Sequence, residues 1–205
     1  MNPVEEPNRE TLLVLARGGD AASLGKLLEQ YRPYMMLMAR LEIGRRLQGK
    51  ADPADLVQDV FLEASRHFPS FRGRTEPEFT AWLRQILATS IARLLRHYLG
   101  TQARDVRLER HLAEDLDRSS AAIPAGLVAQ QSSPSQRASQ REQAVILAEA
   151  LERLPADYRE VLVLRHLEGL TFPTIAQRMG RTLDSVEKLW VRALPKLKQL
   201  LGDPV

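Results

Sequence analysis

Apolar residues recur every three or four positions through most of the chain, which is the spacing of the buried face of an amphipathic α-helix. In residues 8–100 this pattern predicts four helices. Asp52, followed by proline, marks the start of the third helix, whose buried stripe includes Leu56. Thr75 and Glu78 have the spacing of a capping box and start the fourth helix. These residues therefore predict one small helical domain.

Two shorter helical patterns, separated by a tight turn, lie within residues 140–202. Thr171 is a suitable N-cap for the first pattern and Thr182 for the second, and Gly180 supplies the turn between them. Basic residues outnumber acidic ones on the second pattern, so it can lie against DNA phosphates while its first turn meets base edges. This layout predicts a second small domain that carries a helix-turn-helix.

The segment between the two predicted domains differs from them in composition. It is charged up to Arg118 and then rich in Ser, Ala, Gln and Pro from Ser119 to Gln136. Such a composition favours an extended, mobile path over a packed core. We therefore predict a flexible linker over residues 101–139, which gives an all-α fold of two small helical domains joined by that linker.

The overall composition limits the class of protein. At 205 residues with 44% hydrophobic content the chain is long enough to bury two small cores, and the scarcity of β-branched runs favours helices. The lack of cysteine excludes disulfides, thiol catalysis and cysteine-bound zinc, and it suits a reducing compartment. The sequence contains neither a signal-peptide pattern nor a membrane span, so we expect a cytoplasmic protein without membrane insertion. The net charge of +3 favours phosphate-bearing partners only weakly.

Catalytic chemistry has no recognisable motif in this sequence. The four histidines lack ligand spacing with acidic residues, and neither a glycine-rich phosphate loop nor a nucleophile motif stands out. We therefore predict no enzymatic activity, no cofactor and no metal site.

The order of these parts resembles the extracytoplasmic-function (ECF) sigma factors, the small two-domain members of the sigma-70 family of bacterial RNA polymerase sigma factors. In the first domain, DPADLVQDVFLEASRHF is similar to the region 2.2 helix, and FRGRTEPEFTAWLRQILATSIARLLRHY resembles the loop and helix that engage the melted promoter. In the second, residues 151–201 are similar to region 4 with its helix-turn-helix. The phrases GRRLQGKADPADLVQ and SVEKLWVRAL also resemble a planctomycete-type subgroup.

The resemblance implies that the chain binds core RNA polymerase, directs it to paired promoter elements and captures non-template bases as the DNA opens. It implies contacts to the clamp helices of the largest polymerase subunit and to the flap of the second-largest subunit. The residues implied for the clamp contact are Asp55, Leu56, Gln58, Asp59 and Glu63. Without the resemblance, the acidic residues of this set would be interpreted as a solvated helix face.

The loop from Ser70 to Glu76 is the candidate base-capturing loop. Strand opening needs an aromatic surface for an unstacked base and cations along the single strand, because stacking contributes about 1–3 kcal/mol per base. The DNA-contacting candidates of the first domain are Phe71, Arg72, Arg74, Trp82, Arg84, Arg93, Arg96 and His97. The alternative is that the aromatic residues belong to the core and the arginines to a polar helix face.

In the second domain the apolar residues of the last helix are expected to face the core. This leaves a polar set to face the minus-thirty-five promoter element, made up of Arg181, Thr182, Asp184, Ser185, Lys188 and Arg192.

The chain departs from the family pattern in two places. Phe172, Pro173 and Thr174 stand where the family often carries a pair of glutamates, and the asparagine often found near Thr89 is missing. Two other functions stay open on the sequence alone: a stand-alone helix-turn-helix regulator that binds duplex DNA without polymerase, and a helical adaptor whose basic helix binds an acidic protein. Regulation by an anti-sigma factor, by phosphorylation or by synthesis alone is also left open.

Overall fold

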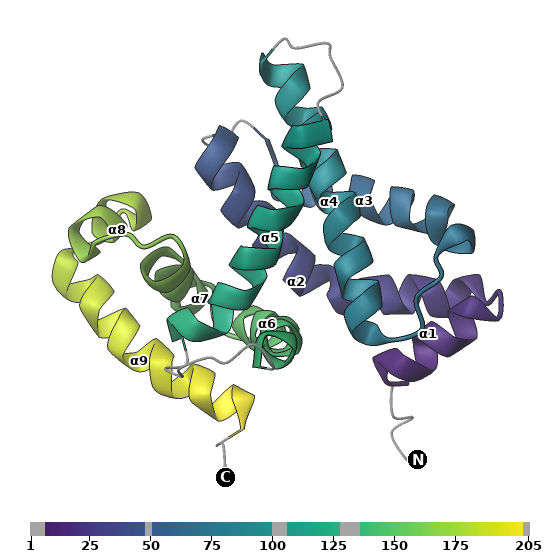
Figure 1. Ribbon diagram of the computed structural model, residues 1–205. Coiled ribbons are helices and arrows are strands. Elements are labelled where there is room, and N and C mark those ends of the chain that lie inside the picture. Colours follow the sequence, from purple (N-terminus) through teal and green to yellow (C-terminus); the bar gives the residue numbers. More distant parts are fainter. Residues whose placement is uncertain (1–6, 48–50, 100–105, 128–135, 203–205) are drawn as a thin grey trace. The chain divides into compact units, whose positions relative to one another are not determined.

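The computed structural model describes residues 7–47, 51–99, 106–127 and 136–202, and within these ranges it contains helices and no strand. The predicted all-α fold class is confirmed (Figure 1). The chain divides into two compact units, Met1–Ser119 and Ser120–Val205, which we call unit 1 and unit 2. No helix in the described ranges is long and apolar enough to cross a bilayer.

Unit 1 is built from helices that pack around one aromatic and aliphatic core. The helix α1 packs against α2, which in turn contacts α3 and α4. The side chains of Tyr31, Tyr34 and Phe79 are among the largest that are completely buried in it. The elements are α1 (Arg9–Arg17), α2 (Ala21–Leu47), α3 (Pro53–His67), a 3-10 turn (Phe68–Ser70), α4 (Glu76–Leu99) and the first part of α5 (Val106–Leu127).

The predicted helix starts of unit 1 are present. The Asp52 carboxylate accepts a hydrogen bond from the Ala54 backbone N–H at 2.8 Å and caps α3. At the start of α4 the Glu78 carboxylate accepts from the backbone N–H groups of Arg74 at 2.7 Å and Thr75 at 3.0 Å, while the Thr75 hydroxyl accepts from the Glu78 N–H at 3.4 Å. This is the predicted capping box, and it fixes the loop that precedes α4.

The capping box makes the stability of unit 1 depend on pH. The backbone N–H of Arg74, together with the hydroxyl and N–H of Thr75, lowers the pKa of the Glu78 carboxyl below its ordinary value of 4.5. Because the folded-state pKa is the lower one, the carboxylate stabilises the fold above that ordinary value, and this contribution is lost as the pH falls through the folded-state pKa.

We expect Glu78→Gln to destabilise unit 1 at neutral pH but not in acid. Urea unfolding of both proteins at several pH values checks this, and a difference that stays constant with pH would contradict it.

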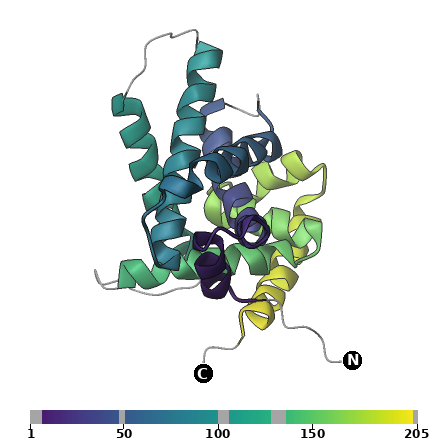
Figure 2. The same cartoon turned by 90° about the vertical axis from the view of Figure 1, so that its right-hand side faces the viewer.

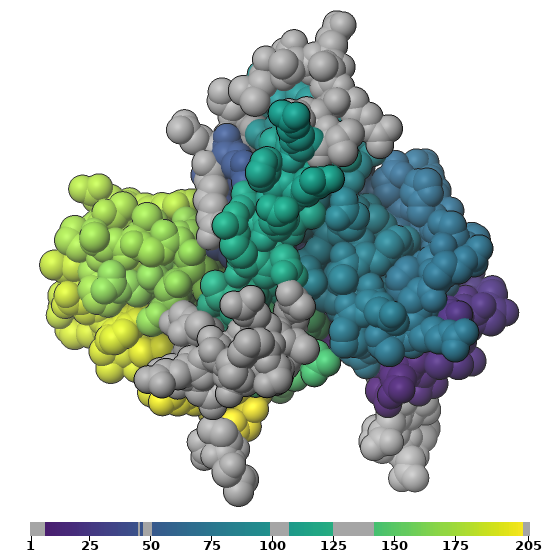
Figure 3. Space-filling view, in the orientation of Figure 1, coloured from purple at the N-terminus to yellow at the C-terminus, as the bar shows by residue number. Residues whose placement is uncertain are grey.

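The chain after α4 departs from the prediction. Its composition predicted an extended linker over residues 101–139, but residues 106–127 form the helix α5 and α6 already begins at Gln136. The first part of α5 runs alongside α4 and buries Leu112 and Leu116 completely (Figure 1, Figure 2). In the space-filling view it covers part of the surface of unit 1 (Figure 3). The other residues of the predicted linker, 101–105 and 128–135, lie outside the described residues.

Unit 2 contains the predicted helix-turn-helix. Thr171 and Thr182 are the N-caps of its two helices, and their hydroxyls accept from the backbone N–H groups of Thr174 and Ser185. Gly180 joins the helices with a left-handed backbone (φ 61°), which favours glycine. The elements are the last part of α5, α6 (Gln136–Glu152), α7 (Ala156–Leu162), a π-helical turn (Val163–Leu167), α8 (Phe172–Met179) and α9 (Leu183–Leu201).

Candidate functional site

One exposed face of α3 carries an acidic stripe. Asp55 and Asp59, one helical turn apart, are both exposed, as is Gln58 between them. Within the described part of the chain neither carboxylate has an ion pair or a hydrogen-bond partner. Leu56 does not belong to this surface, because its side chain is only 5% exposed and lies in the core. The structure therefore corrects the prediction that Leu56 is available to a partner. Leu56 instead belongs to the buried stripe of α3.

Glu63, the last acidic residue of the predicted set, is more constrained. Its carboxylate lies 3.4 Å from Arg66 and 3.3 Å from His67 on its own helix, and 3.7 Å from Arg93 on α4. Its side chain is 21% exposed. Glu63 thus links α3 to α4, and it offers a partner less charge than Asp55 and Asp59 do.

An aromatic cluster lies at the start of α4. The ring of Phe71 lies 4.9 Å from Trp82, 5.7 Å from Phe79 and 5.8 Å from Phe68, measured between centroids. Phe79 is completely buried, whereas Phe71 and Trp82 keep part of their surface exposed. The two candidate aromatic residues therefore combine both interpretations, since they pack onto the core and still present ring surface to a ligand.

The loop beside this cluster requires glycine at position 73. A Cβ there would overlap the ring of Phe71 and come within 2.9 Å of the Glu78 Cβ. The close approach lets the loop fold over the ring, with Arg72 and Arg74 exposed on either side. The sequence prediction missed this role of Gly73, because nothing in the local pattern shows that a ring lies against it.

Two of the predicted DNA-contacting arginines turn inward. Arg84 is 6% exposed and donates hydrogen bonds to the Tyr34 hydroxyl at 3.2 Å and to Asp117 of α5 at 3.1 Å. Arg96 donates to Glu109 of α5 at 3.4 Å, and its side chain is 20% exposed. The structure contradicts the prediction that Arg84 is a DNA contact, and it makes Arg96 a partner of α5. Arg93 and His97 stay exposed on α4.

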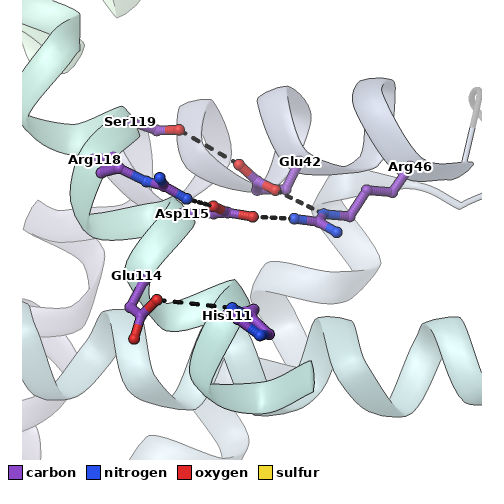
Figure 4. Close-up of polar contacts among 7 residues, drawn as sticks. All are labelled: Glu42, Arg46, His111, Glu114, Asp115, Arg118 and Ser119. Atoms are coloured by element: carbon purple, nitrogen blue, oxygen red, sulfur yellow. Dashed lines mark hydrogen bonds and ion pairs between the residues drawn. The ribbon is translucent and has the colours of Figure 1, made fainter. Parts of the chain in front are cut away.

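A charged network fastens α5 to α2 (Figure 4). The side chain of Glu42 is completely buried and accepts hydrogen bonds from Arg46 at 3.1 Å and from the Ser119 hydroxyl at 3.4 Å. Arg46 also pairs with Asp115, which in turn pairs with Arg118. The charge of Asp115 on α5 is therefore matched by Arg46 on α2, which explains why this polar part of α5 packs there.

The exposed face of α9 carries Asp184, Lys188 and Arg192 at successive turns. Lys188 pairs with Asp184 at 2.7 Å and keeps a side chain that is 64% exposed. Arg181, just before α9, pairs with Asp157 of α7 at 2.6 Å. Thr182 caps the helix by accepting from the N–H of Ser185, which is half-buried. The structure brings this predicted set together at the first half of α9.

The opposite face of α9 is held by an aromatic contact. The Trp190 indole N–H donates to Nε2 of His166 at 2.9 Å, and its ring lies 5.5 Å from that of Phe172. The guanidinium of Arg165 lies over the ring of Phe172, 4.7 Å from its centroid. Phe172 stands at one of the two departures from the family pattern, and it serves here to pack α8 against α9.

Comparison with known proteins adds independent information. The family described as sigma-70 region 2 matches residues 28–102, and the family described as sigma-70, region 4 matches residues 144–197. The ECF RNA polymerase sigma factor SigD of Mycobacterium tuberculosis is 30% identical over 193 residues, which cover 92% of this chain and 82% of that protein. The ECF RNA polymerase sigma-E factor of Escherichia coli is 27% identical over 191 residues, which cover 92% of each. A solved structure of the RsbN–BldN complex contains a chain that is 25% identical, with a TM-score of 0.32, over 92% of this chain and 98% of that chain.

Proposed function

The chain belongs to the ECF group of the sigma-70 family, and from this we propose how its two units divide the work of a sigma factor. Such a factor is a promoter-recognition subunit of RNA polymerase and not an enzyme. Unit 1 would dock on the core polymerase and bind the opened strand, and unit 2 would bind the upstream duplex. Control of this chain by an anti-sigma factor stays one of the open alternatives.

We propose that the acidic stripe of α3 is the polymerase-docking surface. Asp55 and Asp59 support this best, because they are exposed and their charges are not neutralised within the described part of the chain. The expected partner surface is the basic clamp-helix region of the largest polymerase subunit. Gln58 lies on the same face, and Glu63 lies at its edge, whereas Leu56 supports the stripe from the core.

The aromatic cluster is the proposed site of base capture. Phe71 and Trp82 offer ring surface for one unstacked base, and Arg72 and Arg74 lie where they would meet phosphates of the single strand. Arg93, with His97, would extend this cationic surface along α4. A factor that binds the opened strand more tightly than the duplex shifts the melting equilibrium toward the open state, so no catalytic step is required.

In unit 2 we propose that the first half of α9 enters the major groove. Short side chains at its start, Thr182 and Ser185, let the helix approach the bases, while Lys188 and Arg192 would contact phosphates or guanine edges. Arg181 and Asp184 border this surface. The remaining surface of unit 2 would be available for the flap of the second-largest polymerase subunit.

The docking proposal is tested by Asp55→Asn combined with Asp59→Asn in the full-length protein. Because both side chains are exposed, the exchange should leave the fold intact and lower the affinity for core polymerase about tenfold. Fluorescence anisotropy of the labelled protein titrated with core polymerase measures this. Glu10→Gln, which removes an exposed acid of α1, is the matched control. Equal affinity of the double variant and the wild type would refute the proposal.

A further inference from the structure

Trp190 lies on the side of α9 opposite the face proposed to contact DNA. Successive residues of an α-helix are about 100° apart, so Trp190 is on the other side of the helix from both Lys188 and Arg192. Its indole N–H donates to Nε2 of His166 at 2.9 Å, and the two rings are inclined by only 17°. The ring of Phe172, from α8, meets the same indole at 71°. Two elements of unit 2 therefore hold this one side chain of α9.

The apolar contacts of α9 hold it on unit 2 without fixing its rotation. Val186, Ala193 and Leu197 are buried to within 2% of their surface. Burial of apolar area is non-directional, whereas a hydrogen bond weakens steeply when its angle departs from linear. We therefore expect the bond from Trp190 to His166 to set the rotation of α9 about its own axis, and with it the direction of its DNA-facing side chains.

His166 lies in the π-helical turn that follows α7. In this turn the Glu168 N–H donates to the carbonyl of Val163, five residues earlier, at 3.0 Å. Turns of this kind widen a helix by one residue and are frequent at functional sites. Arg165 of the same turn donates to the Leu170 carbonyl at 3.0 Å, which ties the turn to the loop before α8. The imidazole thus reaches α9 from a backbone that is itself held in place.

The hydrogen bond between the two rings requires a neutral imidazole. An indole N–H only donates, so the imidazole nitrogen that faces it carries no hydrogen. Protonation would set one N–H against another and break the contact. Histidine is the side chain that ordinarily gains a proton between pH 8 and pH 5. His166 is the only histidine in the sequence of unit 2, since the other three lie in unit 1.

Charged side chains also lie in the elements that pack on this turn. Glu168 pairs with Arg178 of α8 at 2.7 Å, and Arg165 lies over the ring of Phe172. The other charged residues of α7 and of this side of α9 are Asp157, Arg159, Glu160 and Glu187. Carboxylates and guanidinium groups ordinarily keep their charge from pH 8 down to about pH 5.5. A change in unit 2 over this range is therefore expected to come from the histidine.

We propose that His166 is a positioning residue for promoter recognition: its neutral imidazole holds Trp190 and thereby turns the first half of α9 toward the DNA duplex. Protonation of the imidazole releases Trp190 and lets α9 rotate while unit 2 stays folded. The inference rests on the DNA-binding function proposed for α9, and it adds a residue that does not itself touch DNA. Phe172, which departs from the family pattern, takes part in the same contact.

The test measures the affinity of the holoenzyme for promoter DNA from about pH 8 to about pH 5.5. In His166→Gln an amide oxygen can replace Nε2 as the acceptor and does not gain a proton over this range. The ratio of wild-type to His166→Gln affinity should fall about tenfold, because the contributions of polymerase and DNA are common to both proteins and cancel. His166→Phe keeps a ring without an acceptor, so it should bind about three- to tenfold more weakly than the wild type at pH 8.

Three controls accompany these variants. His111→Gln replaces a histidine of α5 whose side chain is 72% exposed, and it should keep the wild-type pH profile. In a Trp82→Phe background only Trp190 fluoresces, and its emission should change over the same pH range with histidine at position 166 but not with glutamine. Circular dichroism should show the same helix content at both ends of the range.

Four results would overturn the inference. If the wild type and His166→Gln lose affinity in parallel, His166 does not position α9. If His166→Phe binds DNA like the wild type at pH 8, the hydrogen bond has no part in recognition. If helix content falls together with affinity, the contact supports the fold of unit 2 and not the direction of α9. If Lys188→Ala combined with Arg192→Ala leaves DNA affinity unchanged, the proposed function of α9 fails together with this inference, whereas in the first three cases it stands.

Discussion

Replacing Leu116 with alanine is expected to lower the free energy of unfolding of unit 1 by about 2–5 kcal/mol. Leu116 is completely buried on the face of α5 that also carries Leu112, between contacts of Glu109 with Arg96 and of Asp117 with Arg84. The truncation leaves a cavity that the ion-paired neighbours prevent from closing. Urea unfolding followed by the fluorescence of Trp82, in a Trp190→Phe background so that only unit 1 reports, measures the effect.

The matched control for this experiment is Leu62→Ala. Leu62 lies on α3 with half of its side chain exposed, so truncation leaves no cavity and should change stability little. Equal stability of Leu116→Ala and the starting protein would mean that the first part of α5 does not pack into the core of unit 1 and acts as a linker.

The second large effect is expected from Lys188→Ala combined with Arg192→Ala on α9. Both side chains are exposed on the face proposed to enter the groove, and each contact contributes roughly 1–3 kcal/mol, so holoenzyme affinity for promoter DNA should fall about a hundredfold or more. If both residues contact phosphates, the salt dependence should also weaken, with the log–log slope against salt reduced by about two. Filter binding of the holoenzyme across a salt series measures both quantities.

Lys198→Ala is the control for that variant. Lys198 lies in the last turn of α9, away from the end proposed to approach the bases, so its loss should change DNA affinity little. A comparable loss in Lys198→Ala would indicate that general positive charge, and not the position along α9, determines binding.

The helix starts could be predicted from the sequence because caps are local. Asp52, the Thr75–Glu78 pair, Thr171 and Thr182 each bond to backbone groups two to four residues away, so a short pattern contains all of their chemistry. The same holds for Gly180, whose left-handed backbone ends α8. Local hydrogen bonding thus made the helix-turn-helix predictable.

The packing of α5 could not be predicted from its composition. Asp115 pairs with Arg46 and Asp117 with Arg84, residues far away in sequence, and these partners offset the charge that indicated a mobile linker. The leucines at 112 and 116 do have helical spacing, which in retrospect is the local signal for this helix. The helix α5 shows that a charged segment can pack when the surface that it packs on carries the opposite charge.

The candidate residues of the site could be named from the sequence, but the burial of each side chain could not. Spacing placed Leu56 in the buried stripe, while the family resemblance placed it on the docking surface, and burial supports the spacing. For Arg84, helical periodicity gives a direction around α4 but does not reveal the Tyr34 hydroxyl that meets its guanidinium.

The division of work between the two units is tested most directly by one measurement: the equilibrium affinity for core polymerase, without DNA, of the wild type and the two double variants. We predict that Asp55→Asn with Asp59→Asn weakens this affinity, and that Lys188→Ala with Arg192→Ala leaves it unchanged. The reverse pattern, with affinity lost through α9 and kept without the acidic stripe, would contradict the assignment of polymerase docking to unit 1.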